Sequence, residues 1–223
     1  MTLSKDITVL SFSDSSMVDR NSSIIKVDSG WIVYSKNSES SILSFTSDGQ
    51  FSGYIGHRGN GPGEYTSVYD VVVNQKSKVL EVLSDGGIFC YTFGGDFLDK
   101  KEVTYPAFSF AIDDRQNYWF YVGNNTTYGD AKMICTDENI ANVAYYLHQK
   151  SNMLPMVENN FGRNGEWLTF HESLNHDLYT IENGKLDLSY AMDFPNYKTP
   201  APEAYTCRCT SSLSRGTSLL TSW

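Results

Sequence analysis

The sequence has few cysteines, and their spacing excludes the folds and sites that depend on them. The chain of 223 residues contains four, too few and too dispersed to predict a disulfide framework. Cys90 and Cys135 each lie within an apolar strand pattern, so we expect buried thiols at both positions. Cys207 and Cys209 are one residue apart and have no second pair, unlike the ligands of a structural zinc site. We therefore expect no cofactor.

Positive charge is also scarce. The chain has 17 Lys and Arg against 26 Asp and Glu, a net charge of −9, and this balance argues against nucleic acid as a partner because phosphate binding needs a basic surface. No segment approaches the roughly 18 apolar residues of a membrane-spanning helix. The N-terminal segment has neither a charged-then-apolar run nor a cleavage site. We expect no transmembrane segment and no secretion signal within this sequence.

Helix signals are nearly absent, and strand signals dominate. Aromatic residues make up 14% of the chain, a proportion that favours strands over helices. The best helical candidate, residues 137–148, lacks a clean 3.6-residue period. Short apolar runs bounded by Gly, Asn, Asp and Ser recur about every ten residues, a spacing typical of antiparallel proteins. The sequence predicts an all-β fold.

These strand signals repeat at a longer period. Residues 42–51 have a counterpart at 88–97, an offset of 46, and further copies follow at 110–137 and 166–192. Turn pairs such as Asp48-Gly49 favour hairpins, because tight turns need positive φ. A repeated unit of four strands in roughly 40–45 residues is typical of a β-propeller blade. A β-sandwich with coincidental spacing is the alternative.

The repeat predicts where the domain begins and ends. We expect a β-propeller over residues 1–200 with four-stranded antiparallel blades at approximately 23–56, 69–103, 108–147 and 158–192. Residues 7–12 predict an extra strand that closes the last blade and hides its exposed edge. Residues 201–223 are rich in Ser and Thr and show no strand or helix pattern. We expect an irregular tail there, and one hypothesis is a reading frame interrupted near Pro200.

The most distinctive segment is Ile55-Gly56-His57-Arg58-Gly59-Asn60-Gly61-Pro62-Gly63-Glu64-Tyr65, here called the signature loop. Its alternating glycines allow close approach to a neighbouring backbone. The loop resembles the IG-x-x-G-x-GPGEY signature of bacterial six-bladed β-propeller proteins, which are uncharacterised lipoproteins or secreted proteins similar in shape to TolB-like and NHL-like propellers. The preceding pattern at 45–51 is similar to the same family, and Met192-Asp193-Phe194 resembles its DFG motif with Pro195 in place of glycine.

The resemblance has two implications. Six blades need a longer chain than the four copies counted, so the ring is expected to be truncated. Members of that family are found in the periplasm, attached to the outer membrane or outside the cell, so the resemblance implies the same location for this protein. The lipid-modified cysteine that usually follows the export signal of these proteins is missing from the start of this sequence.

In a propeller, the connection between blades lies on the same face as the loops between second and third strands, and that face usually carries the ligand. On this assignment it collects His57, Arg58, Glu64, Tyr65, Lys36, Asn37, Asp85, Asn124, Tyr128, Glu172 and His176. These groups suit a glycan, peptide or protein partner. Glu64 and Tyr65 also have a structural interpretation, which we favour: the carboxylate accepts N–H groups of its own turn and the ring packs between blades.

Enzyme signatures are weak. The signature loop lacks the Lys-Ser/Thr of a phosphate-binding loop, and the chain has no Gly-x-Ser-x-Gly elbow. His57, His171 and His176 with Glu172 are candidate metal ligands, by fold-level analogy with some six-bladed lyases. The sequence favours a non-enzymatic binding module, with a metal-assisted lyase or hydrolase on the same scaffold as the alternative.

Overall fold

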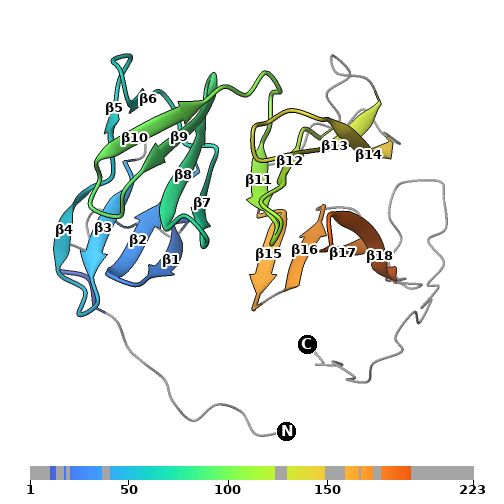
Figure 1. Ribbon diagram of the computed structural model, residues 1–223. Coiled ribbons are helices and arrows are strands. Elements are labelled where there is room, and N and C mark those ends of the chain that lie inside the picture. The colour runs from blue at the N-terminus through green and yellow to red at the C-terminus, as the bar shows by residue number, and fades with distance from the viewer. Residues whose placement is uncertain are drawn as a thin grey trace, which may run out of the picture. The chain divides into compact units, whose positions relative to one another are not determined.

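The structure is a computed structural model that describes residues 11–13, 18, 21–36, 41–123, 130–148, 159–165, 167–172 and 177–191. Every regular element within these ranges is a β-strand (Figure 1). In this part of the chain, no helix is long and apolar enough to cross a membrane. The strands form four separate four-stranded antiparallel sheets and one small two-stranded sheet. The prediction of an all-β chain built from four-stranded propeller blades is confirmed.

Each large sheet is a meander in which consecutive strands pair. The first sheet contains β1 (Ser23–Val27), β2 (Gly30–Tyr34), β3 (Leu43–Thr46) and β4 (Phe51–Tyr54). The second contains β7 (Asp70–Asn74), β8 (Val79–Ser84), β9 (Gly87–Tyr91) and β10 (Phe97–Lys101). The third contains β11 (Ser109–Ile112), β12 (Tyr118–Tyr121), β13 (Ala131–Thr136) and β14 (Ala144–His148). The fourth contains β15 (Phe161–Asn164), β16 (Trp167–His171), β17 (Asp177–Glu182) and β18 (Lys185–Ala191).

The chain divides into two compact units. One comprises residues 1–112 and 118–157, and the other comprises 113–117 and 158–223. The first unit contains the first three sheets except for the hairpin tip between β11 and β12, and the second unit contains the fourth sheet. The candidate site described below is built entirely from the first unit.

The first two sheets share the same turn between their third and fourth strands as well as the same strand pattern. The Oγ1 atoms of Thr46 and Thr92 each accept the backbone N–H four residues later, at 3.0 and 3.1 Å. Gly49 and Gly95 take the position that requires positive φ, at 87° and 101°, where glycine has no Cβ to clash. The 46-residue offset therefore reflects equivalent places in successive sheets.

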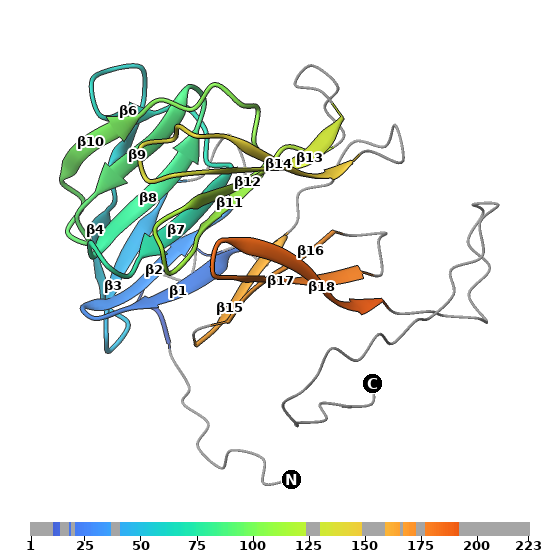
Figure 2. The same ribbon diagram turned by 45° about the vertical axis from the view of Figure 1, so that its right-hand side comes forward.

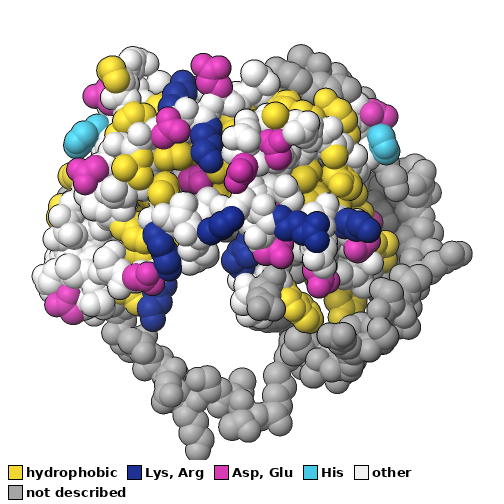
Figure 3. All heavy atoms as spheres, viewed as in Figure 1, with side chains coloured by type: hydrophobic (Ala, Val, Ile, Leu, Met, Phe, Trp, Pro, Cys, Tyr) yellow, Lys and Arg dark blue, Asp and Glu magenta, His cyan; other side chains and the backbone are white. Residues whose placement is uncertain are grey.

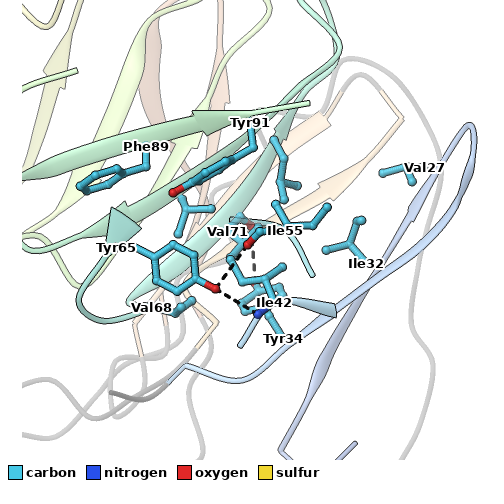
Figure 4. Close-up of a cluster of buried hydrophobic side chains, with 12 residues drawn as sticks. Val27, Ile32, Tyr34, Ile42, Ile55, Tyr65, Val68, Val71, Phe89 and Tyr91 are labelled. Carbon is cyan, nitrogen blue, oxygen red and sulfur yellow. Dashed lines mark hydrogen bonds between the residues drawn. The ribbon is translucent and has the colours of Figure 1, made fainter. Parts of the chain in front are cut away.

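Hydrophobic side chains fill the spaces between successive sheets of the first unit. The cluster between the first two sheets comprises Val27, Ile32, Tyr34, Ile42, Ile55, Tyr65, Val68, Val71, Leu80, Val82, Phe89 and Tyr91 (Figure 4). A second cluster joins the second sheet to the third and includes Phe110, Tyr118 and Phe120. The first strands of these two sheets, β7 and β11, contact each other and lie side by side in both views (Figures 1 and 2). Convergence of first strands is the geometry that blades have around an axis.

The other face of the first sheet is covered by residues near the N-terminus. Val33, Leu43 and Phe45 are buried there against Phe12 and Val18, and the rings of Phe12 and Phe45 lie 4.4 Å apart. Of the strand predicted at 7–12, residues 7–10 lie outside the described part. The described end of that segment is not in a strand.

The buried thiols predicted at Cys90 and Cys135 are confirmed, since both cysteines are free and buried. Desolvation, followed by the nearby Glu81 carboxylate, raises the pKa of the Cys90 thiol to about 12. A thiol with such a pKa is a poor nucleophile at neutral pH, so Cys90 has a packing role. Cys207 and Cys209 lie outside the described residues.

Candidate functional site

The signature loop folds back on itself. β5 (His57–Arg58) pairs in parallel with β6 (Glu64–Tyr65), and the N–H of Gly59 donates to the carbonyl oxygen of Tyr65 at 3.0 Å. Two-residue strands give little cohesion by themselves, so side chains must hold the loop.

Glu64 stabilises the signature loop through hydrogen bonds within the loop. Its Oε2 accepts the N–H of Gly61 at 2.8 Å, and its own N–H donates to the carbonyl oxygen of Gly61 at 3.0 Å. A Cβ at Gly59 would overlap the Glu64 carboxylate, so the loop has glycine where the carboxylate lies. The carboxylate of Glu64 therefore binds the backbone of its own turn.

Tyr65 anchors the loop between the first two sheets. It is 1% exposed, and its hydroxyl donates to the carbonyl oxygen of Ile55 and accepts the N–H of Ile42, both at 3.3 Å (Figure 4). Desolvation is the main reason that its pKa is raised. A buried ring with a satisfied hydroxyl stabilises the fold, so Tyr65 packs inside the protein. The contacts of both residues match the structural interpretation: the Glu64 carboxylate accepts an N–H of its own turn, and the Tyr65 ring is buried in the cluster between the first two sheets.

Two other glycines of the loop lie against aromatic rings of the second sheet. Gly56 has φ +61° and Gly63 has φ +74°; a Cβ on either would come within 2.6 Å of Tyr91 or Phe97, respectively. The Tyr91 hydroxyl donates to the carbonyl oxygen of Gly63 at 2.9 Å. The loop is thus clamped onto the second sheet through contacts that only glycine permits.

Directly after the loop, a cluster of hydroxyl groups binds the exposed carboxylate of Asp85 in the β8–β9 turn. The hydroxyls of Thr66 and Ser67 donate to its Oδ2 at 2.9 and 2.8 Å, and the hydroxyl of Tyr69 donates to its Oδ1 at 2.6 Å. These hydrogen bonds, that of Tyr69 first, lower the pKa of Asp85 in spite of some desolvation. Arg58 joins the cluster, because its Nε donates to the carbonyl oxygen of Thr66 at 3.1 Å. The arrangement presents a fixed anion and a cation on one surface.

A buried ion pair involves Asp70, the residue directly after Tyr69. The Lys36 Nζ is 2.8 Å from Asp70 Oδ1, and the two side chains are only 9% and 8% exposed. Asp70 also accepts the N–H of Val71 at 3.0 Å, the N–H of Phe110 at 3.1 Å and the Tyr34 hydroxyl at 3.4 Å. Burial raises the pKa of the Asp70 carboxyl, an effect that Lys36 and the two N–H groups oppose. One carboxylate thereby joins the first, second and third sheets.

Residues 8–220 match the sequence family described as Domain of unknown function (DUF4934). The chain belongs to this family. No curated protein matches the sequence.

Solved structures with the same fold include two Bacteroides proteins. A putative exported protein from Bacteroides fragilis has a TM-score of 0.71 at 16% identity, over 82% of this DUF4934 chain and 53% of that chain. A member of the DUF4221 family from Bacteroides vulgatus has a TM-score of 0.57 at 11% identity, over 82% of this chain and 60% of that one. The DUF4934 chain therefore spans little more than half the length of either protein, and at these identities the likeness shows the fold alone.

The structure brings together only some of the residues predicted for the ligand face. Arg58 and Asp85 lie around Thr66 and are exposed, and His57 is exposed beside Arg58. Lys36 is a correction to the prediction, because its ammonium is buried against Asp70 and is not presented to a ligand. Glu172 belongs to the second unit and is 8% exposed. Asn37, Asn124, Tyr128 and His176 lie outside the described residues.

Metal ligands do not converge in the described part of the DUF4934 chain, where no three His, Cys, Asp or Glu side chains come together. His176, one of the predicted ligands, is not among the residues described. The sequence reasoning also missed Thr66, Ser67, Tyr69 and Asp70. The only signal in the sequence was a run of polar and aromatic residues between the signature loop and the apolar strand β7. Such a run is typical of an ordinary connection, and its contact with the β8–β9 turn is visible only in the structure.

Proposed function

We propose that this DUF4934 chain is a non-enzymatic binding module that presents the surface around Arg58 and Asp85 to a glycan, peptide or protein partner. The observation that carries the proposal is the Asp85 carboxylate, which is exposed and yet held by three hydroxyl groups. A charged group fixed at the surface loses little conformational freedom when it binds, which favours affinity.

The support beneath this surface is rigid. Glu64 and Tyr65 lock the signature loop internally, and Gly56 and Gly63 leave no room between the loop and the second sheet. Binding groups on a rigid support keep their geometry better than groups on a free loop. In this interpretation, the glycines, Glu64 and Tyr65 of the signature loop form the support, and Arg58 together with the residues that follow the loop contacts the partner.

Surface charge narrows the class of partner. On the surface shown in Figure 3, acidic side chains lie among the lysines and arginines, and the chain carries a net charge of −9. A polyanion such as nucleic acid would be repelled on average, because phosphate-binding proteins gather positive charge on one face. A neutral or mixed-charge partner suits this surface better.

The family resemblance and the structural likeness support two further parts of the proposal. The sheets belong to a six-bladed propeller, as the signature loop implies, and the protein acts in the periplasm, attached to the outer membrane or outside the cell. The similar protein from Bacteroides fragilis is described as exported.

Binding measurements with the full chain test the proposal. We expect at least one probe among a set of soluble neutral oligosaccharides and of acidic and basic peptides to bind in titration calorimetry. Asp85→Asn should weaken that binding by about tenfold or more, because a hydrogen bond to a charged group is worth about 1.5–3 kcal/mol. Asp114→Asn is the matched control, since Asp114 is an exposed acid outside the cluster, and it should leave affinity unchanged.

Equal affinity of the wild type and Asp85→Asn would move the binding surface elsewhere, and no binding by any probe would remove the proposal. The metal-assisted alternative has a separate signature. Under it, chelation lowers the melting temperature and a divalent cation restores it, because a bound metal stabilises the folded state.

A further inference from the structure

Two exposed aromatic residues occupy equivalent places in the second and third sheets. Tyr69 directly precedes β7 and Phe108 directly precedes β11. The Tyr69 N–H donates to the carbonyl oxygen of Leu83 at 2.9 Å, and the Phe108 N–H donates to that of Tyr121 at 2.8 Å. Tyr69 is 39% exposed and Phe108 is 37% exposed. The same point of the repeat thus leaves a large ring at the surface in both sheets.

The two strands that these residues begin lie against each other. β7 and β11 are in contact (Figures 1 and 2), and the Asp70 carboxylate on β7 binds the backbone N–H of Phe110 on β11 at 3.1 Å. Tyr69 is the neighbour of Asp70, and Phe108 is two residues before Phe110. The two aromatic residues therefore precede adjacent strands at the same end, and a buried hydrogen bond joins those strands nearby.

Tyr69 is held in place although it is exposed. Its hydroxyl binds Asp85 at 2.6 Å, and Asp85 is held in turn by Thr66 and Ser67. One edge of the ring is tied to a carboxylate, and a substantial part of the ring remains at the surface. A fixed, partly exposed aromatic ring is a binding surface that needs no ordering when a ligand arrives.

We propose that Tyr69 and Phe108 form a stacking surface for the sugar rings of a neutral glycan, with Asp85 and Arg58 binding its hydroxyl groups. This inference rests on the proposed function and names the ligand class of that site. A pyranose ring offers an apolar C–H face and a rim of hydroxyls, which match aromatic rings beside a carboxylate acceptor and a guanidinium donor. The bases of a nucleic acid also stack on aromatic rings, but their phosphates are disfavoured by the net charge of −9.

Titration calorimetry of the full chain with neutral oligosaccharides tests the stacking surface. We expect Tyr69→Ala and Phe108→Ala each to weaken binding by about three- to tenfold, as aromatic contacts usually do. Tyr69→Phe keeps the ring and removes its hydrogen bond to Asp85, so it should weaken binding less than Tyr69→Ala. Tyr145→Ala is the control, because Tyr145 is 56% exposed in β14 and lies outside the proposed surface. Melting curves of each variant exclude a general loss of folding.

The outcomes show whether the inference fails alone or together with the proposed function. Glycan binding that survives both alanine substitutions would overturn the stacking surface. The chain could instead bind peptides and no glycan, with an affinity that Asp85→Asn lowers and that Tyr69→Ala and Phe108→Ala leave unchanged. That result would overturn the glycan assignment and leave the binding function intact. Absence of binding to glycans and peptides alike would overturn both.

Discussion

Asp70→Ala is expected to destabilise the first unit by about 3–5 kcal/mol, the usual cost of removing one partner of a buried ion pair. Without the carboxylate, the Lys36 ammonium stays buried without its counter-ion, and the Phe110 N–H loses its acceptor. The change disturbs three sheets at once, because Asp70 connects them. Chemical denaturation followed by tyrosine and tryptophan fluorescence measures the loss.

Two comparisons distinguish the buried pair from an ordinary surface acid. Asp114→Ala removes an exposed carboxylate and should change stability by less than about 0.5 kcal/mol. Lys36→Met combined with Asp70→Leu removes both charges, and we expect this double variant to be more stable than Asp70→Ala alone. A cost for Asp70→Ala as small as that for Asp114→Ala would show that Asp70 does not join the sheets.

Gly56→Ala is expected to cost about 2–4 kcal/mol, from a left-handed backbone and an overpacked contact together. Gly56 has φ +61°, and the new methyl group would lie 2.6 Å from a carbon of the Tyr91 ring. The ring has little freedom to move, because Tyr91 is fully buried and its hydroxyl binds Gly63. The shift in denaturation midpoint measures the effect.

Gly94→Ala is the control for this substitution. Gly94 lies in the β9–β10 turn, is exposed, and a Cβ there would meet its nearest neighbour at an ordinary 3.5 Å. We expect a change below about 0.5 kcal/mol. Similar costs at Gly56 and Gly94 would contradict the description of the signature loop as clamped onto the second sheet.

The sheets were predictable from the sequence because their signals are local. Alternating apolar residues and turn glycines act within a few residues of each other, so the match between segments 42–51 and 88–97 translated directly into equivalent strands and turns. The third sheet shows the limit of that pattern. There Ile140 has φ 58° in the turn between β13 and β14, and no glycine marks the position.

The candidate site was only partly predictable. Glu64 interacts within its own turn, so its structural role could be inferred from loop chemistry. Lys36 was misplaced because its partner, Asp70, is 34 positions away in the sequence and belongs to another sheet. Neither residue type nor spacing shows which charges meet between sheets. The Tyr69–Asp85 hydrogen bond lies within the second sheet but joins a residue before β7 to the β8–β9 turn, 16 positions apart, and no residue pattern marks that contact.

The central structural claim is that the first strands of the second and third sheets, β7 and β11, converge and that Asp70 joins them. Native-state hydrogen exchange of the Phe110 amide, followed by NMR, tests it most directly. The account predicts a strongly protected Phe110 amide in the wild-type chain, and in Asp70→Ala a loss of protection at Phe110 that is larger than the loss at the Val82 amide in β8. A Phe110 amide that exchanges rapidly in the wild type, or that remains protected without Asp70, would contradict it.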